Sequence, residues 1–123
     1  MRSSHIAAVV DDDEAVRIAM FSLVRSLGFQ AIVFDSARTY LLSPHITNTT
    51  CLITDVLMPG MSGIEMHDRL LVLGHAPPTI FVTAFPTADI REKVMANGAL
   101  AVLEKPVDVD DIAFWLDVAS RKR

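Results

Sequence analysis

The chain has 123 residues, of which 51% are hydrophobic, and its 15 acidic against 11 basic side chains give a formal net charge of −4. This length is typical of one domain with its own core, so we expect residues 1–123 to form a single domain, and the negative charge argues against direct nucleic-acid binding. Cys51 is the only cysteine, and the apolar runs are shorter than the ~20 residues that span a bilayer, so we expect a cytoplasmic protein without disulfides or membrane spans.

The first third of the chain alternates apolar runs with helical patterns. Residues 6–10 (Ile-Ala-Ala-Val-Val) predict a buried strand, because this run is too short for a helix. Between Glu14 and Leu27 apolar residues recur at helical spacing, and Gly28 follows where a helix C-cap is expected. Residues 31–34 predict the second strand, and Ser36 is a suitable N-cap for a short helix.

The same alternation continues through the middle of the chain. Residues 51–54 predict the third strand, and the loop that follows leads to Ser62-Gly-Ile-Glu65, which matches a capping box at the start of a helix. Residues 79–82 predict the fourth strand.

Residues 87–97 have helical spacing, residues 101–103 predict a fifth strand, and Asp108 is a suitable N-cap for a last helix that runs towards Arg121. Five short apolar strands that alternate with five helices predict an α/β fold. We expect a flavodoxin-like, doubly wound parallel sheet with strand order 2-1-3-4-5.

Polar side chains follow the ends of four predicted strands. The acidic run 11–14 follows the first strand, Asp55 the third, Thr83 the fourth, and Lys105 the fifth. Taken singly, each has an ordinary structural explanation, such as compensation of a helix dipole or a surface lysine. Because the carboxyl ends of parallel strands meet at one edge of the sheet, we expect these side chains to share one crevice.

The chemistry of this crevice follows from its charges. Ionised Asp11, Asp12 and Asp55 repel each other at close range, so they need a cation, and hard oxygen ligands favour Mg²⁺. A phosphoryl group in the crevice would meet the metal on one side, Lys105 on the other, and the hydroxyl of Thr83. A carboxylate can itself act as the nucleophile and give an aspartyl-phosphate.

Four segments together resemble the receiver domains of bacterial two-component response regulators, most closely those of transcriptional regulators with a helix-turn-helix output domain. The segments are Val-Val-Asp-Asp-Asp-Glu at 9–14, Ile-Thr-Asp-Val-Leu-Met-Pro-Gly-Met-Ser-Gly at 53–63, Val-Thr-Ala at 82–84 and Glu-Lys-Pro at 104–106. The resemblance covers nearly the whole chain. It implies a signalling phosphoacceptor that catalyses only its own phosphorylation and dephosphorylation, rather than an enzyme with a separate substrate.

The resemblance also implies a role for each matching residue. Asp55 corresponds to the phosphoacceptor, which receives its phosphoryl group from a phosphohistidine on a sensor histidine kinase. Asp11 and Asp12 match the acidic pair that binds Mg²⁺, with Asp12 the more direct ligand, and the backbone carbonyl of Leu57 matches a further ligand.

Two more site residues follow from the same resemblance. Thr83 matches the hydroxyl that switches conformation, and Lys105 matches the lysine that binds phosphate. The bond between Lys105 and Pro106 corresponds to one that is cis in the family.

The chain departs from the family pattern at three positions. Val102 stands where a rotating aromatic residue is usual, so the usual form of signal transmission is in question. Leu57 replaces a side chain that is commonly polar or basic, and Phe85 lies two residues after Thr83. We hypothesise that Leu57 and Phe85 screen an aspartyl-phosphate from water and so prolong the phosphorylated state.

Several apolar residues lie off the predicted core faces of the first and last helices. Phe114 and Val118 form such a pair on the last helix, and Ile18 and Phe21 on the first. Isolated exposed apolar residues are common, but these would also suit partner contacts. The resemblance implies kinase docking on the first helix, and contact of the last helix with an output domain that binds DNA or with a second receiver in a homodimer.

Two other functions remain as alternatives. A Mg²⁺-dependent phosphatase of the haloacid-dehalogenase type would use Asp11 as its nucleophile and Asp13 beside it, but the chain has no room for a cap domain. A degenerate receiver would act only as an interaction module. The complete set of acidic, hydroxyl and lysine residues argues against that reading.

Overall fold

The computed structural model describes residues 5–122, which form one five-stranded parallel sheet in the order β2-β1-β3-β4-β5. The strands are β1 (Ile6–Val10), β2 (Gln30–Phe34), β3 (Cys51–Asp55), β4 (Thr79–Thr83) and β5 (Ala101–Glu104). The helices are α1 (Glu14–Ser26), α2 (Ala37–Leu41), α3 (Gly63–Leu73), α4 (Ala88–Ala96) and α5 (Val109–Arg121). The predicted flavodoxin-like fold is therefore confirmed, including its strand order.

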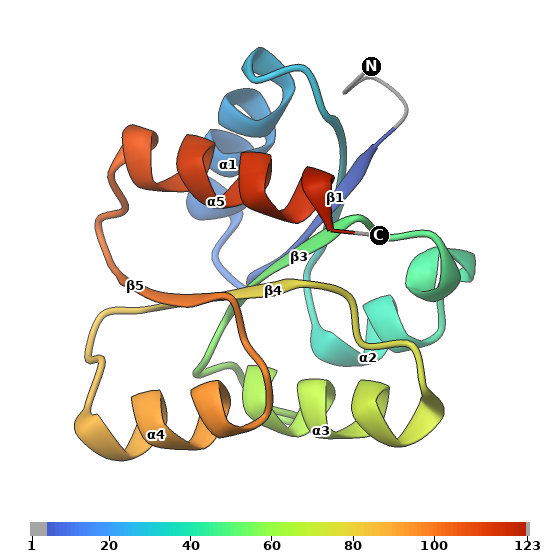
Figure 1. Ribbon diagram of the computed structural model, residues 1–123, viewed down its shortest axis with the longest axis vertical. Coiled ribbons are helices and arrows are strands. Elements are labelled where there is room, and N and C mark those ends of the chain that lie inside the picture. The colour runs from blue at the N-terminus through green and yellow to red at the C-terminus, as the bar shows by residue number, and fades with distance from the viewer. Residues whose placement is uncertain (1–4, 123) are drawn as a thin grey trace.

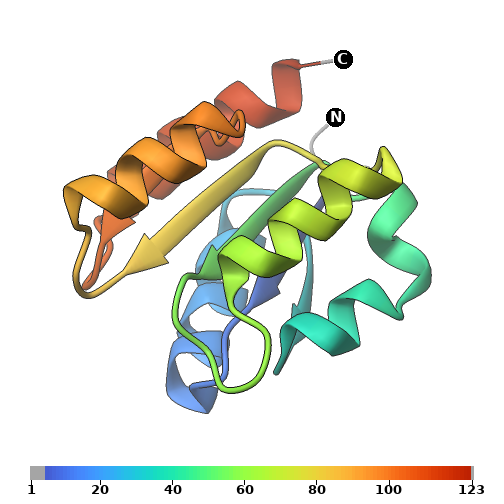
Figure 2. The ribbon, with the colours of Figure 1, turned by 90° about the horizontal axis from the view of Figure 1, so that it is seen from below.

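The helices form a layer on each face of the sheet. Helices α1 and α5 cover one face, while α2, α3 and α4 cover the other (Figure 1). Seen from below, the strands all point in the same direction, in agreement with the parallel pairing of all neighbouring strands (Figure 2). All five residues of β3 and of β4 are buried, because helices cover these central strands on both sides.

The core divides along these two layers. Alternate strand residues such as Val9 and Ile53 pack with α1 and α5, whereas Val10 and Leu52 pack with α2 and α3. On α5 the predicted core stripe is confirmed, since Ile112, Leu116 and Ala119 are fully buried and Trp115 packs against them. Cys51 is fully buried in β3, and burial raises the pKa of its thiol.

Local sequence signals set the helix boundaries. The predicted capping box is present: the Ser62 hydroxyl accepts a hydrogen bond from Glu65 N, and the Glu65 side chain accepts one from Ser62 N. Ser36 and Asp108 cap α2 and α5 as predicted. Gly28 follows α1 with φ of 92°, a left-handed conformation that favours glycine.

The structure differs from the sequence-based elements in small ways. A 3-10 helix at Pro44–Thr47 was not predicted. Strands β3 and β4 each extend one residue further, so that Asp55 and Thr83 are the last residues of their strands. The residues interpreted as following the strands are thus held by the sheet itself. Among residues 5–122 there is no helix with the length and apolar character needed to cross a membrane.

Candidate functional site

Asp11 lies directly after β1 and is held by the sheet and by the loop that follows. Its N–H donates to the carbonyl of Phe34 at 3.1 Å, which continues the pairing of β1 with β2. Its Oδ1 accepts a hydrogen bond from the N–H of Asp13 at 2.9 Å. Asp13 in turn caps α1, because its Oδ1 accepts from the N–H of Ala15 at 2.9 Å. The buried Asp11 carboxylate is therefore fixed between strand and helix.

Asp55 and Lys105 come from neighbouring parts of the same sheet edge. Asp55 ends β3, its side chain is 11% exposed, and its Oδ1 accepts from the N–H of Leu57 at 3.3 Å. Lys105 follows β5, where its N–H donates to the carbonyl of Thr83 at 2.9 Å. The peptide bond from Lys105 to Pro106 is cis, as the sequence resemblance implied.

The lysine joins the two buried carboxylates. Lys105 Nζ lies 3.0 Å from Asp55 Oδ2 and 3.2 Å from Asp11 Oδ2. Asp12, which is exposed, completes an acidic group in which one carboxylate oxygen from each of Asp11, Asp12 and Asp55 lies within 4.8 Å of the others. Oxygen donors of this kind suit a hard divalent cation such as Mg²⁺, which binds through few carboxylates and keeps several waters. The residues present therefore fit a magnesium site.

Burial and charge act in opposite directions on these groups. Burial raises the pKa of Asp11, and this outweighs the hydrogen bond from Asp13 and the charge of Lys105, which both lower it. Burial lowers the pKa of Lys105, but the hydrogen bond to Asp55 and the charges of Asp11 and Asp55 together raise it overall. The lysine thus stays protonated and partly compensates the acidic group.

Thr83 lies at the same sheet edge but is held differently. It is 1% exposed, and its hydroxyl oxygen accepts a hydrogen bond from the N–H of Phe85 at 3.2 Å. Strand alternation places its side chain on the opposite face from Val82. The side chains of Leu57 and Phe85 are 62% and 71% exposed at this edge. The structure brings Asp11, Asp12, Asp55 and Lys105 together, with Thr83 at the end of the adjacent strand.

Two residues that shape the site were not identified from the sequence. A Cβ atom on Gly63, the first residue of α3, would overlap the backbone carbonyl of Asp55. Arg17 Nη1 donates a hydrogen bond of 2.7 Å to the backbone carbonyl of Asp11. The available signals were the glycine directly after Ser62, and a basic residue near the start of α1, a few residues after the acidic run 11–14.

Val102 lies in a small apolar cluster between the sheet and α4. It is 8% exposed and packs with Phe81, Val94 and Ile90. Phe81, its direct neighbour in β4, is fully buried, and its ring contacts the ring of His67 edge-on at 5.4 Å between centroids. The aromatic side chain at this level of the sheet therefore comes from β4 rather than from β5.

The outward apolar residues of α1 and α5 are exposed to different degrees. Ile18 is 62% exposed and Phe114 is 59% exposed, while Val118 is half-buried. The ring of Phe114 contacts that of Trp115 edge-on at 4.9 Å. A mainly apolar cavity of about 560 Å³ lies between α1 and the segment after β5, and Lys105 forms part of its wall.

Comparison with known proteins assigns this arrangement to a family. The family described as the response regulator receiver domain matches residues 7–116. The chain is 38% identical to the response regulator protein TmoT of Ectopseudomonas mendocina over 85% of this chain and 47% of that protein. It is 32% identical to the transcriptional regulatory protein FixJ of Bradyrhizobium diazoefficiens over 93% of this chain and 56% of that protein. The chain thus spans about half the length of the curated relatives it matches.

Solved structures give the same result. The response regulator StyR matches with a TM-score of 0.89 and 33% identity, covering 96% of this chain and 60% of that chain. The structure named FixJ-N matches with a TM-score of 0.86 and 30% identity, covering 97% of this chain and 95% of that chain. The chain therefore belongs to the response regulator receiver domain family, the phosphorelay receivers of two-component systems.

Proposed function

We propose that residues 1–123 form a single cytoplasmic receiver domain that accepts a phosphoryl group on Asp55. The observation that carries this proposal is the position of Lys105 Nζ, which is 3.0 Å from Asp55 and 3.2 Å from Asp11 beside the exposed Asp12. The donor is a phosphohistidine on a sensor histidine kinase. An Asp55 carboxylate oxygen attacks the phosphorus, an O–P bond forms as the P–N bond breaks, and the leaving imidazole takes up a proton.

The carboxylates of Asp11, Asp12 and Asp55 and the backbone carbonyl of Leu57 would hold Mg²⁺, with Asp12 the more direct ligand. When bound, the ion neutralises charge on the phosphoryl oxygens. Lys105 contacts a second phosphoryl oxygen from the opposite side of the site. Phosphoryl transfer depends mainly on such positioning and charge neutralisation, so these residues catalyse only phosphorylation and dephosphorylation of the domain itself.

Thr83 carries the change to the outer surface. Its hydroxyl oxygen accepts from Phe85 N, and its O–H remains a donor that can reach a phosphoryl oxygen after a local shift. Val102 packs beside Phe81 in the cluster behind this strand. We assign the role of the usual strand-five aromatic to this cluster, so that movement of Thr83 repacks Phe81 and Val102 together.

The partners follow from the faces next to the site. The kinase docks on α1, beside the apolar cavity of about 560 Å³ whose lining includes Lys105. The exposed Phe114 and the half-buried Val118 suit a homodimer through the face of α5, or contact with a DNA-binding output domain. An output domain is supported by FixJ, a transcriptional regulatory protein of which this chain covers 56%.

Intact-mass measurement after incubation with Mg²⁺ and acetyl phosphate tests the proposal. The wild type should gain the mass of one phosphoryl group, and Asp55→Asn should gain none. Asp68→Asn is a matched control, because Asp68 lies on α3 and contacts Asn97 and Lys93 rather than the acidic group. No gain in the wild type would favour a degenerate receiver that acts only as an interaction module. Gain in Asp55→Asn would favour a phosphatase-like site at Asp11.

A long-lived phosphorylated state is expected from Leu57 and Phe85. The N–H of Leu57 donates to Asp55, so the Leu57 side chain stands beside the phosphoacceptor without a polar group to orient an attacking water. Leu57→Asn should shorten the lifetime of the phosphorylated state several-fold, measured as loss of the phosphoryl mass after removal of the donor. Leu42→Asn changes another exposed leucine, just after α2, and should have no effect. Equal lifetimes for Leu57→Asn and the wild type would contradict this expectation.

A further inference from the structure

Arg17 makes a side-chain contact beyond its own helix. It is the fourth residue of α1, where its N–H makes an intrahelical hydrogen bond to the carbonyl of Asp13 at 3.0 Å. Its side chain is half-buried and turns back towards β1, so that Nη1 donates a hydrogen bond of 2.7 Å to the backbone carbonyl of Asp11. The contact joins the helix to the loop that carries the acidic residues.

The bonded carbonyl belongs to the peptide that links Asp11 to Asp12. Asp11 is already fixed on its other sides by Phe34, by the N–H of Asp13 and by Lys105. A peptide unit is planar, so the direction of the Asp11 carbonyl also sets the direction in which the chain continues to Asp12. Arg17 therefore helps to fix the position of the Asp12 backbone, from which the exposed carboxylate extends.

The charge and the hydrogen bond of Arg17 have opposite effects on a bound cation. The positive charge repels Mg²⁺, but solvent screens a partly exposed guanidinium. The hydrogen bond holds the ligands in place, and Mg²⁺ demands nearly ideal octahedral geometry. Contacts that orient metal ligands typically contribute about 10–100-fold to metal affinity. The positioning effect therefore outweighs the repulsion.

We propose that Arg17 is a positioning residue that holds the Asp11–Asp12 peptide in the orientation required for Mg²⁺ binding. This inference rests on the proposed function, because it assumes that Asp11 and Asp12 bind the metal. On this proposal, the start of α1 contributes to Mg²⁺ affinity in addition to the acidic residues.

Calorimetric titration of the metal-free protein with Mg²⁺ tests the inference without phosphorylation. Arg17→Gln should raise the dissociation constant about tenfold. Arg17→Lys keeps the charge but has a shorter reach and lacks the planar guanidinium, so it should weaken binding in the same direction. In the metal-free protein, both variants should also speed hydrogen exchange at the amides of Asp12 and Asp13, while exchange in β3 stays unchanged.

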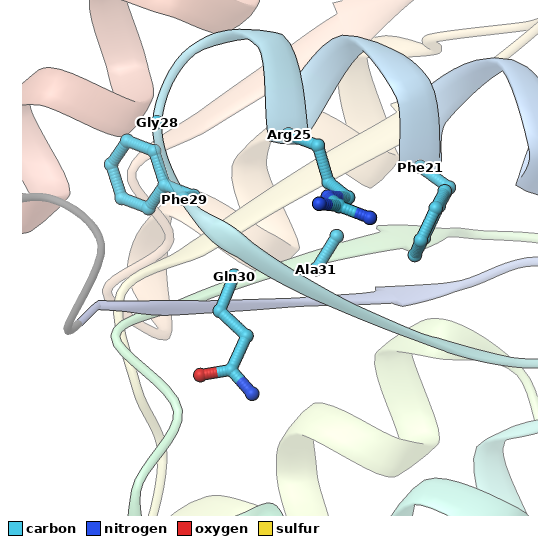
Figure 3. A pocket seen from close by; sticks show the side chains of 6 residues that line it. All are labelled: Phe21, Arg25, Gly28, Phe29, Gln30 and Ala31. Carbon is cyan, nitrogen blue, oxygen red and sulfur yellow. The ribbon is translucent and has the colours of Figure 1, made fainter.

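Arg25 provides a matched control on the same helix. It lies eight residues further along α1, about 12 Å away at the helical rise, and its guanidinium is 5.6 Å from the ring centre of Phe21. Figure 3 shows both side chains beside a separate cavity of about 380 Å³ at the far end of the helix, above Gln30 and Ala31. Arg25→Gln removes the same charge from the same helix, and should leave the Mg²⁺ dissociation constant within about twofold of the wild type.

The outcomes separate the inference from the proposed function. Weaker Mg²⁺ binding in both Arg17 variants, with faster exchange at Asp12 and Asp13, supports the inference. Unchanged or tighter binding in Arg17→Gln, with the wild type binding normally, overturns the inference and leaves the proposed function standing. A wild type that binds no Mg²⁺ overturns both. If Arg17→Gln does not unfold cooperatively, Arg17→Lys decides on the same criteria.

Discussion

At the scale of single residues, the site depends on the ammonium group of Lys105, which lies between two buried carboxylates. Lys105 contacts both Asp11 and Asp55, and the raised pKa of Asp11 shows that burial is not fully compensated. An acidic group of this kind is costly in the free domain, and a divalent cation at the site would relieve that cost. The sequence predicted these residues because strand ends in a parallel sheet converge on one edge. It did not predict Arg17, because its contact depends on the path of one long side chain.

His67 makes stability depend on pH away from the site. It is 2% exposed on α3, and its Nδ1 has no hydrogen-bond partner among the described residues. Burial lowers the pKa of His67, while the nearby charge of Asp68 acts in the opposite direction. The folded protein therefore binds this proton less readily than the unfolded chain. His67 therefore does not reduce the free energy of unfolding above its ordinary pKa of 6.5, but reduces it as the pH falls below that value.

We expect the free energy of unfolding of the wild type to fall from about pH 7 to about pH 5 more steeply than that of His67→Leu, which cannot take up the proton. Urea denaturation at each pH measures this difference, and other titrating groups contribute equally to both proteins. His75→Leu removes an exposed histidine and should keep the wild-type slope. Parallel slopes for the wild type and His67→Leu would show that burial of His67 does not affect its protonation.

At the scale of elements, local signals decided most of the fold. The caps at Ser36, Ser62 and Asp108 and the apolar strands could all be recognised, because each depends on neighbours in sequence. The 3-10 helix at Pro44–Thr47 was missed because its single turn, capped by Ser43, is too short to give a periodic pattern, whereas a second class of features depends on contacts between distant segments. The close approach of α3 to Asp55 belongs to this second class.

Gly63→Ala tests how closely α3 must approach the phosphoacceptor strand. A Cβ atom there would overlap the Asp55 carbonyl and approach Thr54 Oγ1. We expect the free energy of unfolding to fall by about 3 kcal/mol and phosphorylation to slow, because the backbone that carries Asp55 must move.

Gly60→Ala provides the comparison in the loop just before α3. Gly60 has φ of +77° and no atoms within 4 Å of its would-be Cβ, so only backbone strain of about 1 kcal/mol is expected. Chemical denaturation of both variants and their rates of phosphorylation by acetyl phosphate provide the measurements. Equal losses for the two variants would mean that strain, rather than the contact with Asp55, governs this loop.

At the scale of the whole molecule, the site and the outer faces lie on different parts of one sheet. The acidic group is at the carboxyl edge, while α5 crosses the face that it shares with α1 (Figure 1). Family membership follows from the order and spacing of the motifs across residues 7–116. Partner contacts on the outer faces of α1 and α5 could not be predicted in the same way. Exposed apolar residues such as Phe114 are also common on surfaces that bind no partner.

Self-association through α5 gives a prediction at this scale. The wild type should sediment faster after addition of Mg²⁺ and acetyl phosphate, and the double variant Phe114→Ser with Val118→Ser should not, because it lacks the apolar contact. Ile18→Ser, which removes an apolar residue of similar exposure from α1, should behave as the wild type. Identical sedimentation of the wild type with and without phosphodonor, across a range of concentrations, would rule out this dimer.

Chemical trapping of the phosphorylated residue tests the central claim most directly. Borohydride reduces an aspartyl-phosphate to homoserine, which peptide mapping locates along the chain. After incubation with Mg²⁺ and acetyl phosphate, we predict reduction at Asp55, in the strand end that Lys105 contacts at 3.0 Å. Reduction at Asp11 would contradict the account, since it would make that carboxylate the nucleophile and leave Asp55 as a ligand only.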